Sequence, residues 1–312
     1  MLIDLTAEFF AALAAPDPEA AYGDYLQRHR AVLSAYWHNY VLDLDTPPAR
    51  EVIRHALAAD HTDLKVLLAS RDIPALVTEA LARADELTGA ERPTDCYLMV
   101  GVGAANAGEL VVNGRGAIFV CLEHFTGRPN PSTYGMGLPA ELLPLWVGHE
   151  VAHVVRYTAG DGQSELRRLI AEFGGNYDSG MTGSRGTLRE HLVNEGLAVH
   201  AAQAVAPGLQ AADYFGYVRR QHQRLRELEA FLRRAVEPDL DRAALGLRLR
   251  YLSGGMSAAS RTINGKVLPE RSGYYLGHRM TEAAVRTLGL DQALRLAAPD
   301  LEERDLSAAA SA

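Results

Sequence analysis

The sequence predicts an α+β protein that is mostly helical, with a small β-sheet and a helical N-terminal region. Apolar residues recur at helical spacing through residues 1–90 and again from about residue 143 to about residue 298. Between them, residues 95–122 hold short apolar runs bounded by glycines, the pattern of strands. Residues 174–186 and 252–273 are exceptions within the second helical stretch, which we expect to be loops over a cleft. We divide the chain into a helical N-terminal region (1–90), a second domain (91–300) and a flexible tail (301–312).

The N-terminal region shows helical faces in series. Phe9, Phe10 and Leu13 share the first face, and later apolar and aromatic residues continue the pattern to Tyr40. Pro47 and Pro48 break it, a further helix follows from about Ala49, and another runs over residues 73–87. We interpret the aromatic residues near position 37 as core.

Two β-type runs follow, at residues 95–102 and 117–122, and residues 107–114 offer a short strand and turn between them. Gly101 and Gly103 lack the third glycine and the helix of a nucleotide-binding fingerprint. A strand at the edge of this sheet is expected to offer its free N–H and C=O groups to an extended peptide.

Residues 149–153 carry the chemistry: they read His-Glu-Val-Ala-His. On a helix, His149 and His153 lie one turn apart on one face and can bind one metal ion, with Glu150 placed as a general base. Mostly apolar residues surround the motif, which indicates a buried helix that begins between Pro139 and Leu143. Buried histidines and a buried glutamate need a partner, and a metal supplies one.

A third ligand is expected downstream, because catalytic zinc usually takes three protein ligands. Thr187 begins a predicted helix through a capping-box pattern, and Glu195 lies in its third turn between apolar residues. We favour Glu195 as the ligand. His191, one turn earlier, is the main alternative: it is either the third ligand itself or a residue that hydrogen-bonds to a metal ligand. His200 and Glu172 are weaker alternatives for the third ligand.

These motifs resemble the gluzincin group of metallopeptidases, and more narrowly a bacterial family of predicted zinc-dependent proteases. The likeness rests on the His-Glu-Val-Ala-His run, the Glu195-Gly196-Leu197-Ala198 run and a Gly-Tyr-rich block at residues 273–278, and it covers roughly residues 95–290. It implies a zincin-like catalytic core, one zinc ion per chain held by His149, His153 and Glu195, and Glu150 as the base.

One position departs from the pattern of familiar gluzincins, which often place an acid four residues beyond the ligand glutamate to orient a zinc-binding histidine. Val199 stands there in this chain. We therefore expect Asn194, His191 or a backbone carbonyl to orient His149 and His153 instead.

The predicted function is hydrolysis of peptide bonds by a zinc-bound water assisted by Glu150. A second donor for the developing oxyanion is sought in the Gly-Tyr-rich block, where we choose Tyr275 first and His278 second over Tyr274. Arg271 is a candidate to hold a substrate carboxylate, but we favour a position on the surface. The alternatives are a metal-stabilised helical binding or regulatory module without turnover, and a metallohydrolase of a non-peptide amide.

Composition restricts the partners. The net charge is −8 and no basic stripe stands out, so we expect a peptide or protein substrate and no nucleic acid. The acidic N-terminus does not resemble a signal peptide and no apolar run is long enough for a membrane span, so a cytoplasmic protein without membrane contact is expected. Cys96 and Cys121 are predicted to be small buried residues.

Overall fold

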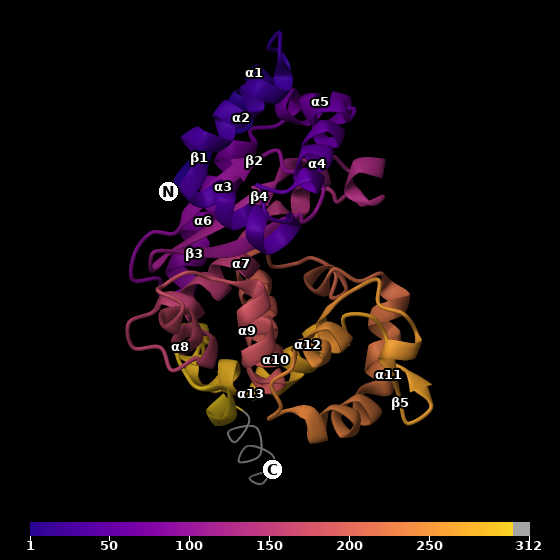
Figure 1. Cartoon of the computed structure of the whole chain (residues 1–312). Coiled ribbons are helices and arrows are strands. Elements are labelled where there is room, and N and C mark those ends of the chain that lie inside the picture. The colour runs from indigo at the N-terminus through magenta and orange to yellow at the C-terminus, as the bar shows by residue number, and fades with distance from the viewer. Residues whose placement is uncertain (302–312) are drawn as a thin grey trace.

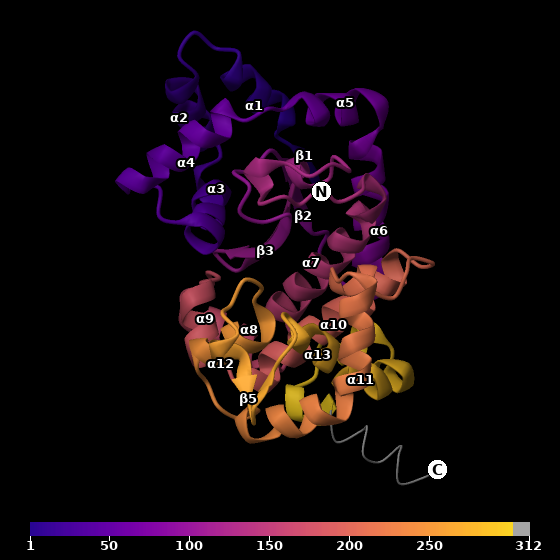
Figure 2. The same cartoon turned by 90° about the vertical axis from the view of Figure 1, so that its right-hand side faces the viewer.

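The computed structural model describes residues 1–301 and has the mostly helical α+β architecture that the sequence predicts. The N-terminal helices and a four-stranded sheet form one half of the molecule, and the C-terminal helices form the other (Figures 1 and 2). Helix α7 (Leu143–Thr158), which carries the His-Glu-Val-Ala-His run, lies between the two halves. The predicted tail falls almost entirely on residues 302–312, which lie outside the described residues.

The N-terminal half contains the helices expected from the periodicity, with an additional π-helical turn, η1, that follows α3 directly. Their bounds are α1 (Thr6–Leu13), α2 (Pro18–Arg28), α3 (Arg30–Tyr36), η1 (Trp37–Val41), α4 (Pro47–Ala58), α5 (Thr62–Ser70) and α6 (Ile73–Thr88). Asp17 and Asp72 cap the first turns of α2 and α6 by accepting backbone N–H groups, and prolines stand at the start of α2, α4 and α6.

The sheet has the order β1-β2-β4-β3. Its strands are β1 (Leu2–Asp4), β2 (Asp95–Met99), β3 (Ala107–Val112) and β4 (Arg115–Cys121). Strands β1, β2 and β4 are parallel, and β3 pairs antiparallel with β4 across the tight turn at Asn113 and Gly114, both of which have positive φ. The sequence did not predict β1, because three residues are too few for a period to be read.

Helices cover both faces of the sheet. Tyr36 and Tyr40 pack edge-on against Phe119 of β4 on one face, with ring centroids 4.9 and 4.7 Å away. On the other face α7 approaches so closely that a Cβ on Gly116 would lie 2.3 Å from Val154. The sheet therefore holds α7 in a fixed position, and its edge strand β3 lies beside the helix that carries the motif.

The C-terminal half is a helical assembly around α10 and α13. Its helices are α8 (Glu165–Glu172), α9 (Ser179–Arg185), α10 (Leu188–Val205), α11 (Arg219–Val236), α12 (Leu245–Leu252), α13 (Ser272–Leu288) and α14 (Leu290–Ala293). A hairpin, β5 (Thr262–Ile263) with β6 (Lys266–Val267), interrupts the segment before α13. One continuous hydrophobic core includes residues from Leu5 to Leu301 and so joins both halves.

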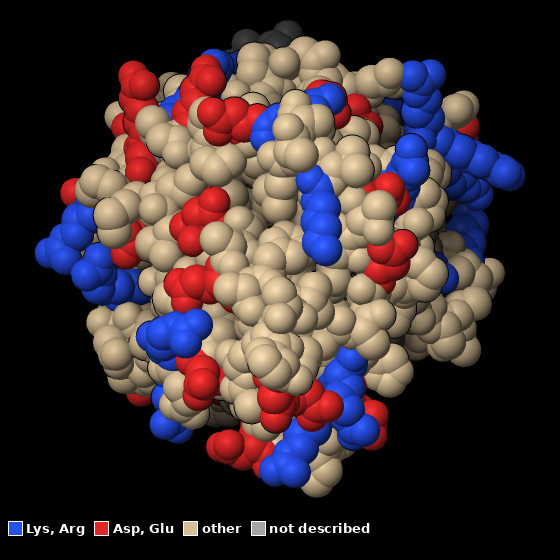
Figure 3. All heavy atoms as spheres, turned by 90° about the horizontal axis from the view of Figure 1, so that it is seen from above, with Lys and Arg blue, Asp and Glu red and all other residues tan. Residues whose placement is uncertain are grey.

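Figure 3 views the molecule from the end that carries the N-terminal helices, and acidic and basic side chains are interspersed on that face. Among residues 1–301, no helix has the length and apolar character needed to cross a bilayer. Cys96 and Cys121 are both free and fully buried, as the sequence predicts.

Candidate metal site

The His-Glu-Val-Ala-His run lies in the middle of α7, as the sequence predicts. Leu142 precedes the first residue of the helix, Pro144 occupies its first turn, and a short 3₁₀ segment, η4 (Ala140–Leu142), leads into it. His149, Glu150 and His153 are each at most 4 % exposed. The two imidazoles are therefore both buried, and they point to the same side of α7.

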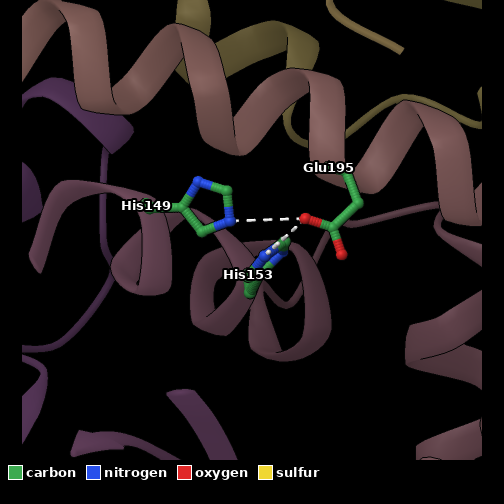
Figure 4. Close-up of side chains that lie close together, drawn as sticks. All are labelled: His149, His153 and Glu195. Carbon is green, nitrogen blue, oxygen red and sulfur yellow. Dashed lines mark ion pairs between the residues drawn. The ribbon is translucent and has the colours of Figure 1, made fainter. Parts of the chain in front are cut away.

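Glu195 approaches these histidines from α10. Its Oε2 atom lies 3.3 Å from Nε2 of His149 and 3.6 Å from Nε2 of His153, as Figure 4 shows. Thr187 caps α10 by accepting the N–H of Glu190, which confirms the predicted start of that helix. Glu190 does not complete the capping box, because its side chain bonds Arg156 of α7 instead.

That bond fixes α10 against α7. Arg156 is fully buried, and its Nη2 lies 2.8 Å from Oε1 of Glu190, which also accepts the hydroxyl of Ser164. Arg156 follows His153 by three residues and Glu190 precedes Glu195 by five, so the ion pair sets the alignment of the two helices that carry the candidate ligands. Breaking one partner of such a buried pair is strongly destabilising.

The donor set fits a zinc ion. The three ligand atoms lie within 4.8 Å of one another, and Oε2 of Glu195 has no hydrogen-bond donor in the described structure. Two ligands bound to zinc at about 2.0–2.1 Å with tetrahedral geometry stand roughly 3.3 Å apart, close to the observed Glu195 separations. Two imidazoles and one carboxylate are also the protein ligands of a familiar class of catalytic zinc sites.

The pKa values of the three residues in the cluster depend strongly on one another. Burial alone would raise the pKa of Glu195, but the adjacent His153 and His149 hold it well below its usual range. Burial opposes protonation of His153, yet Glu195 raises the pKa of that imidazole to about 10. For His149 burial prevails and lowers the pKa. The carboxylate is thus kept ionised, which is the form that binds metal.

The rings of His149 and His153 are oriented by aromatic packing. Nδ1 of each has no hydrogen-bond partner among residues 1–301. His149 contacts the rings of Trp146 and Tyr274, and His153 stacks on Tyr157 with centroids 6.0 Å apart. The polar partners expected from the sequence are engaged elsewhere: Asn194 donates to the hydroxyl of Tyr157, and His191 bonds the carbonyl of Thr182.

Glu150 lies against a second buried carboxyl, Glu109 of β3. Burial raises the pKa of Glu150 well above its usual range, and the neighbouring Glu109 and Glu195 raise it further, while His153 opposes them. Glu109 accepts hydrogen bonds from the hydroxyls of Tyr40 (2.7 Å) and Tyr157 (3.1 Å). The sequence reasoning missed Glu109, although a lone carboxylate within the apolar run of residues 107–112 was the available signal.

Strand β3 is the sheet edge nearest the motif, but two of its outward carbonyls already accept hydrogen bonds. The hydroxyl of Tyr40 donates to the carbonyl of Glu109 at 2.9 Å, and the N–H of Tyr177 donates to that of Val111 at 2.9 Å. A peptide that added to this edge would have to displace both donors. The expectation of strand addition is therefore not met at these two positions in this conformation.

In the Gly-Tyr-rich block, Tyr274 is the tyrosine that contacts the cluster. Its ring stacks on His149, and the guanidinium of Arg271 lies 4.3 Å from its centroid. Tyr275, the first choice from the sequence, instead donates to Oε2 of Glu229 on α11 at 2.6 Å. Consecutive helical residues point about 100° apart, so the same turn of α13 cannot present both hydroxyls to the metal ligands. Arg271 is half-buried beside the cluster rather than on the open surface.

His278 and the two alternative histidine ligands lie elsewhere. His278 stacks on His200 at 4.1 Å and contacts the side chain of Gln203. His200 bonds the carbonyl of His278. Burial lowers the pKa of His191 to about 3, which describes a neutral imidazole bound to Thr182. Glu172, the last alternative, forms exposed ion pairs with Arg168 and Arg185.

The Glu195-Gly196-Leu197-Ala198 run and the Gly-Tyr-rich block meet in one helix contact. A Cβ on Gly196 would lie 2.1 Å from the backbone of Gly277, and a Cβ on Gly277 would lie 1.8 Å from the carbonyl oxygen of Leu192. The glycines therefore let α10 and α13 touch at their backbones. This contact brings Tyr274 of α13 to the histidines while Glu195 of α10 faces them.

Residues 178–301 match the model of the family described as Predicted Zn-dependent protease (DUF2268). This is the family of predicted zinc-dependent proteases that the motifs resemble, and the matched residues include Glu195 and the Gly-Tyr-rich block. The His-Glu-Val-Ala-His run lies before the matched region, so the structure, rather than the family match, joins it to Glu195. Neither the curated proteins nor the solved structures yielded a match.

Proposed function

We propose that the chain is a zinc-dependent peptidase in which His149, His153 and Glu195 bind one zinc ion and Glu150 is the general base. The observation that carries the proposal is the convergence of Glu195 on both histidines of the motif, 42 residues beyond His153 in sequence and 3.3–3.6 Å from their ring nitrogens in space. The protease family matched by residues 178–301 supports a peptide or protein as the substrate.

A bound zinc ion would act as a Lewis acid and lower the pKa of its bound water toward neutrality. Glu150 follows the first ligand on α7 and would accept a proton from the attacking water, then donate it to the leaving amine. Glu109 confines the Glu150 carboxyl from the β3 side.

The hydroxyl of Tyr274 is our choice for the second donor to the scissile carbonyl oxygen. It belongs to the residue whose ring lies on His149, with centroids 6.1 Å apart. Arg271 beside it keeps positive charge near the same position. Negative charge that develops on the carbonyl oxygen would be stabilised by both groups.

Two other functions predict different behaviour. A metal-stabilised binding module without turnover has no use for Glu150, and a hydrolase of non-peptide amides would retain the same residues with another substrate. The proposal is tested with Glu150→Gln, assayed on a mixture of fluorogenic peptides after zinc content is measured. We expect the variant to retain one zinc per chain and to lose at least ~10³-fold in kcat, because the base is gone. Wild-type rates in this variant would contradict the mechanism, and a zinc-loaded wild type that cleaves no peptide would favour the other two functions.

A further inference from the structure

A second cavity lies outside the metal cluster, at the carboxyl ends of β2 and β4. It has a volume of about 620 Å³ and is lined by the end of α4, the turn into α5, the residue 101–103 loop after β2, Glu123 after β4, and residues 130–134. None of the metal-cluster residues lines it. Crevices at the carboxyl ends of parallel strands are common ligand sites, and this volume is typical of small-molecule pockets.

Glu123 forms the polar part of the wall. It is 4 % exposed, and its two oxygens accept the N–H groups of Gly101 (2.9 Å) and Gly103 (3.0 Å). Gly101 permits this approach, because a Cβ there would lie 2.8 Å from Oε1 of Glu123. The N–H groups of these two glycines bind the carboxylate of Glu123 at the cavity wall. This agrees with the missing third glycine, which a nucleotide-binding loop would have.

The carboxylate retains unused bonding capacity. An ionised carboxylate offers about four lone-pair directions. The N–H groups of Gly101, Gly103 and Glu123 itself engage this carboxyl and leave one direction open. Burial raises the pKa of Glu123 to about 7 despite these amides. A carboxyl group in this condition lacks the positive partner that would favour its charged form.

The neighbouring His124 is also incompletely satisfied. Its ring is fully buried, neither ring nitrogen has a hydrogen-bond partner within residues 1–301, and Nε2 lies 3.9 Å from Oε1 of Glu123. Burial lowers the pKa of His124 to about 4, so this imidazole is neutral and does not supply the missing charge. Buried polar groups without partners are uncommon in folded proteins. His124 does not itself line the cavity, but it stands directly behind Glu123, which does.

The lining of the cavity lacks positive charge. Of the described residues around it, Glu123 and Asp60 are acidic and none is lysine or arginine. His61 bonds the carbonyl of Ala56, and burial lowers its pKa. Val52, Ala56 and Ala58 of α4 supply apolar lining, and His55 of the same helix is a polar lining residue. The cavity thus combines an apolar surface from α4 with polar groups, among which Glu123 is a buried carboxyl group.

We propose that this cavity binds a small organic cation, a primary ammonium on an apolar body, with the ammonium at Glu123 and the apolar part against α4. The ammonium would donate to the open lone-pair direction of the carboxylate and form the ion pair that the chain itself does not provide. This inference is independent of the peptidase proposal, since it uses none of the metal-cluster residues.

The test is a titration of the full-length, zinc-loaded protein with benzylamine, benzyl alcohol and benzoate, followed by calorimetry and ligand-observed NMR. We expect benzylamine to saturate one site and to bind at least tenfold more tightly than the alcohol, with no binding of benzoate. Equal affinities for the amine and the alcohol, or the absence of saturable amine binding, would overturn the proposal.

Variants locate the site. Glu123→Gln should weaken benzylamine binding at least tenfold, and Ala59→Trp, which fills the cavity from the end of α4 and leaves Glu123 intact, should also abolish it. The second variant is needed because a glutamine NH₂ would face one of the glycine N–H groups. Glu91→Gln is the matched control: Glu91 also accepts a glycine N–H, that of Gly160, beside a different cavity, and its loss should not change binding. Binding that survives both Glu123→Gln and Ala59→Trp but is lost in Glu195→Gln would assign the amine to the metal cluster and refute the inference.

Discussion

The rings of Tyr274 and His149 stack with their centroids 6.1 Å apart and their planes inclined by 22°. The contact joins α13 to α7 across the candidate metal cluster, although 125 residues separate the two positions in the sequence. It identifies which of two adjacent tyrosines contacts the candidate metal cluster, since Tyr275 is bonded to Glu229.

Tyr274→Phe is expected to lower kcat on peptides by about 10²-fold, the usual cost of removing one oxyanion donor. The phenyl ring preserves the packing on His149, so zinc content and the melting temperature should change little. The measurement is steady-state kinetics on zinc-quantified protein.

Tyr275→Phe is the matched control for that experiment. It removes the same hydroxyl one residue later and breaks only the bond to Glu229, at a cost of about 1 kcal/mol in the free energy of unfolding. Activity near that of the wild type is expected. If Tyr275→Phe proved inactive and Tyr274→Phe active, the original choice from the sequence would be restored.

Zinc binding should depend on Glu195. Glu195→Gln keeps the size of the side chain but removes its charge, and we expect the zinc content measured by mass spectrometry to fall from one per chain to well below one after dialysis. Glu172→Gln, at an exposed glutamate paired with Arg168 and Arg185, should retain zinc. Full zinc content in Glu195→Gln would show that another residue is the third ligand.

The contact between α10 and α13 should not tolerate a methyl group. Gly277→Ala would place a Cβ 1.8 Å from the carbonyl oxygen of Leu192, so the helices must move apart, and we expect a loss of about 1–3 kcal/mol or more in the free energy of unfolding. Gly246→Ala is the control, because a Cβ at this position of α12 meets nothing within 4 Å. It should be neutral or stabilise by up to about 1 kcal/mol. Equal melting temperatures for the two variants would contradict the close packing.

Acid stability should depend on His191. Its pKa in the folded protein is lowered to about 3 by burial, whereas in the unfolded chain it is near 6.5. Below pH 6.5 the unfolded state binds a proton that the folded state does not, so the free energy of unfolding falls as the pH decreases toward 3. Above pH 6.5 the residue adds no pH dependence.

The variant His191→Gln can still donate to Thr182 and does not titrate. Between pH 6 and pH 4, its free energy of unfolding should decline less steeply than that of the wild type. The two slopes should differ by about 1.4 kcal/mol per pH unit, the effect of one proton. Urea denaturation at several pH values measures the difference. Parallel pH curves for the two proteins would rule out a neutral, buried His191, and retained zinc in the variant would separate this residue from the ligands.

The sequence predicted much of the local structure because its signals are local. The start of α10 at Thr187, the helix around His149 and His153, and the strands β2 and β4 all follow from caps, periodicity and breakers within a few residues. Strand β1 was missed because it exists only through its pairing with β2. The short helix α9 was expected to be loop, since its glycine- and serine-rich sequence is stabilised by the cap at Asp178 and by tertiary contacts.

By itself, the sequence determined that the candidate ligands His149 and His153 share one face of α7, because helix geometry fixes which residues four apart lie together. It also favoured Glu195 as the candidate third ligand, because this carboxylate lies among apolar residues of a capped helix. Only the tertiary structure decided that Tyr274 rather than Tyr275 lies on His149, that Glu109 contacts Glu150, and that Glu123 borders a cavity. Each of these depends on the rotation and separation of elements distant in sequence. Those quantities are set by backbone contacts such as Gly196 against Gly277 and by the buried Arg156–Glu190 pair, which no local periodicity encodes.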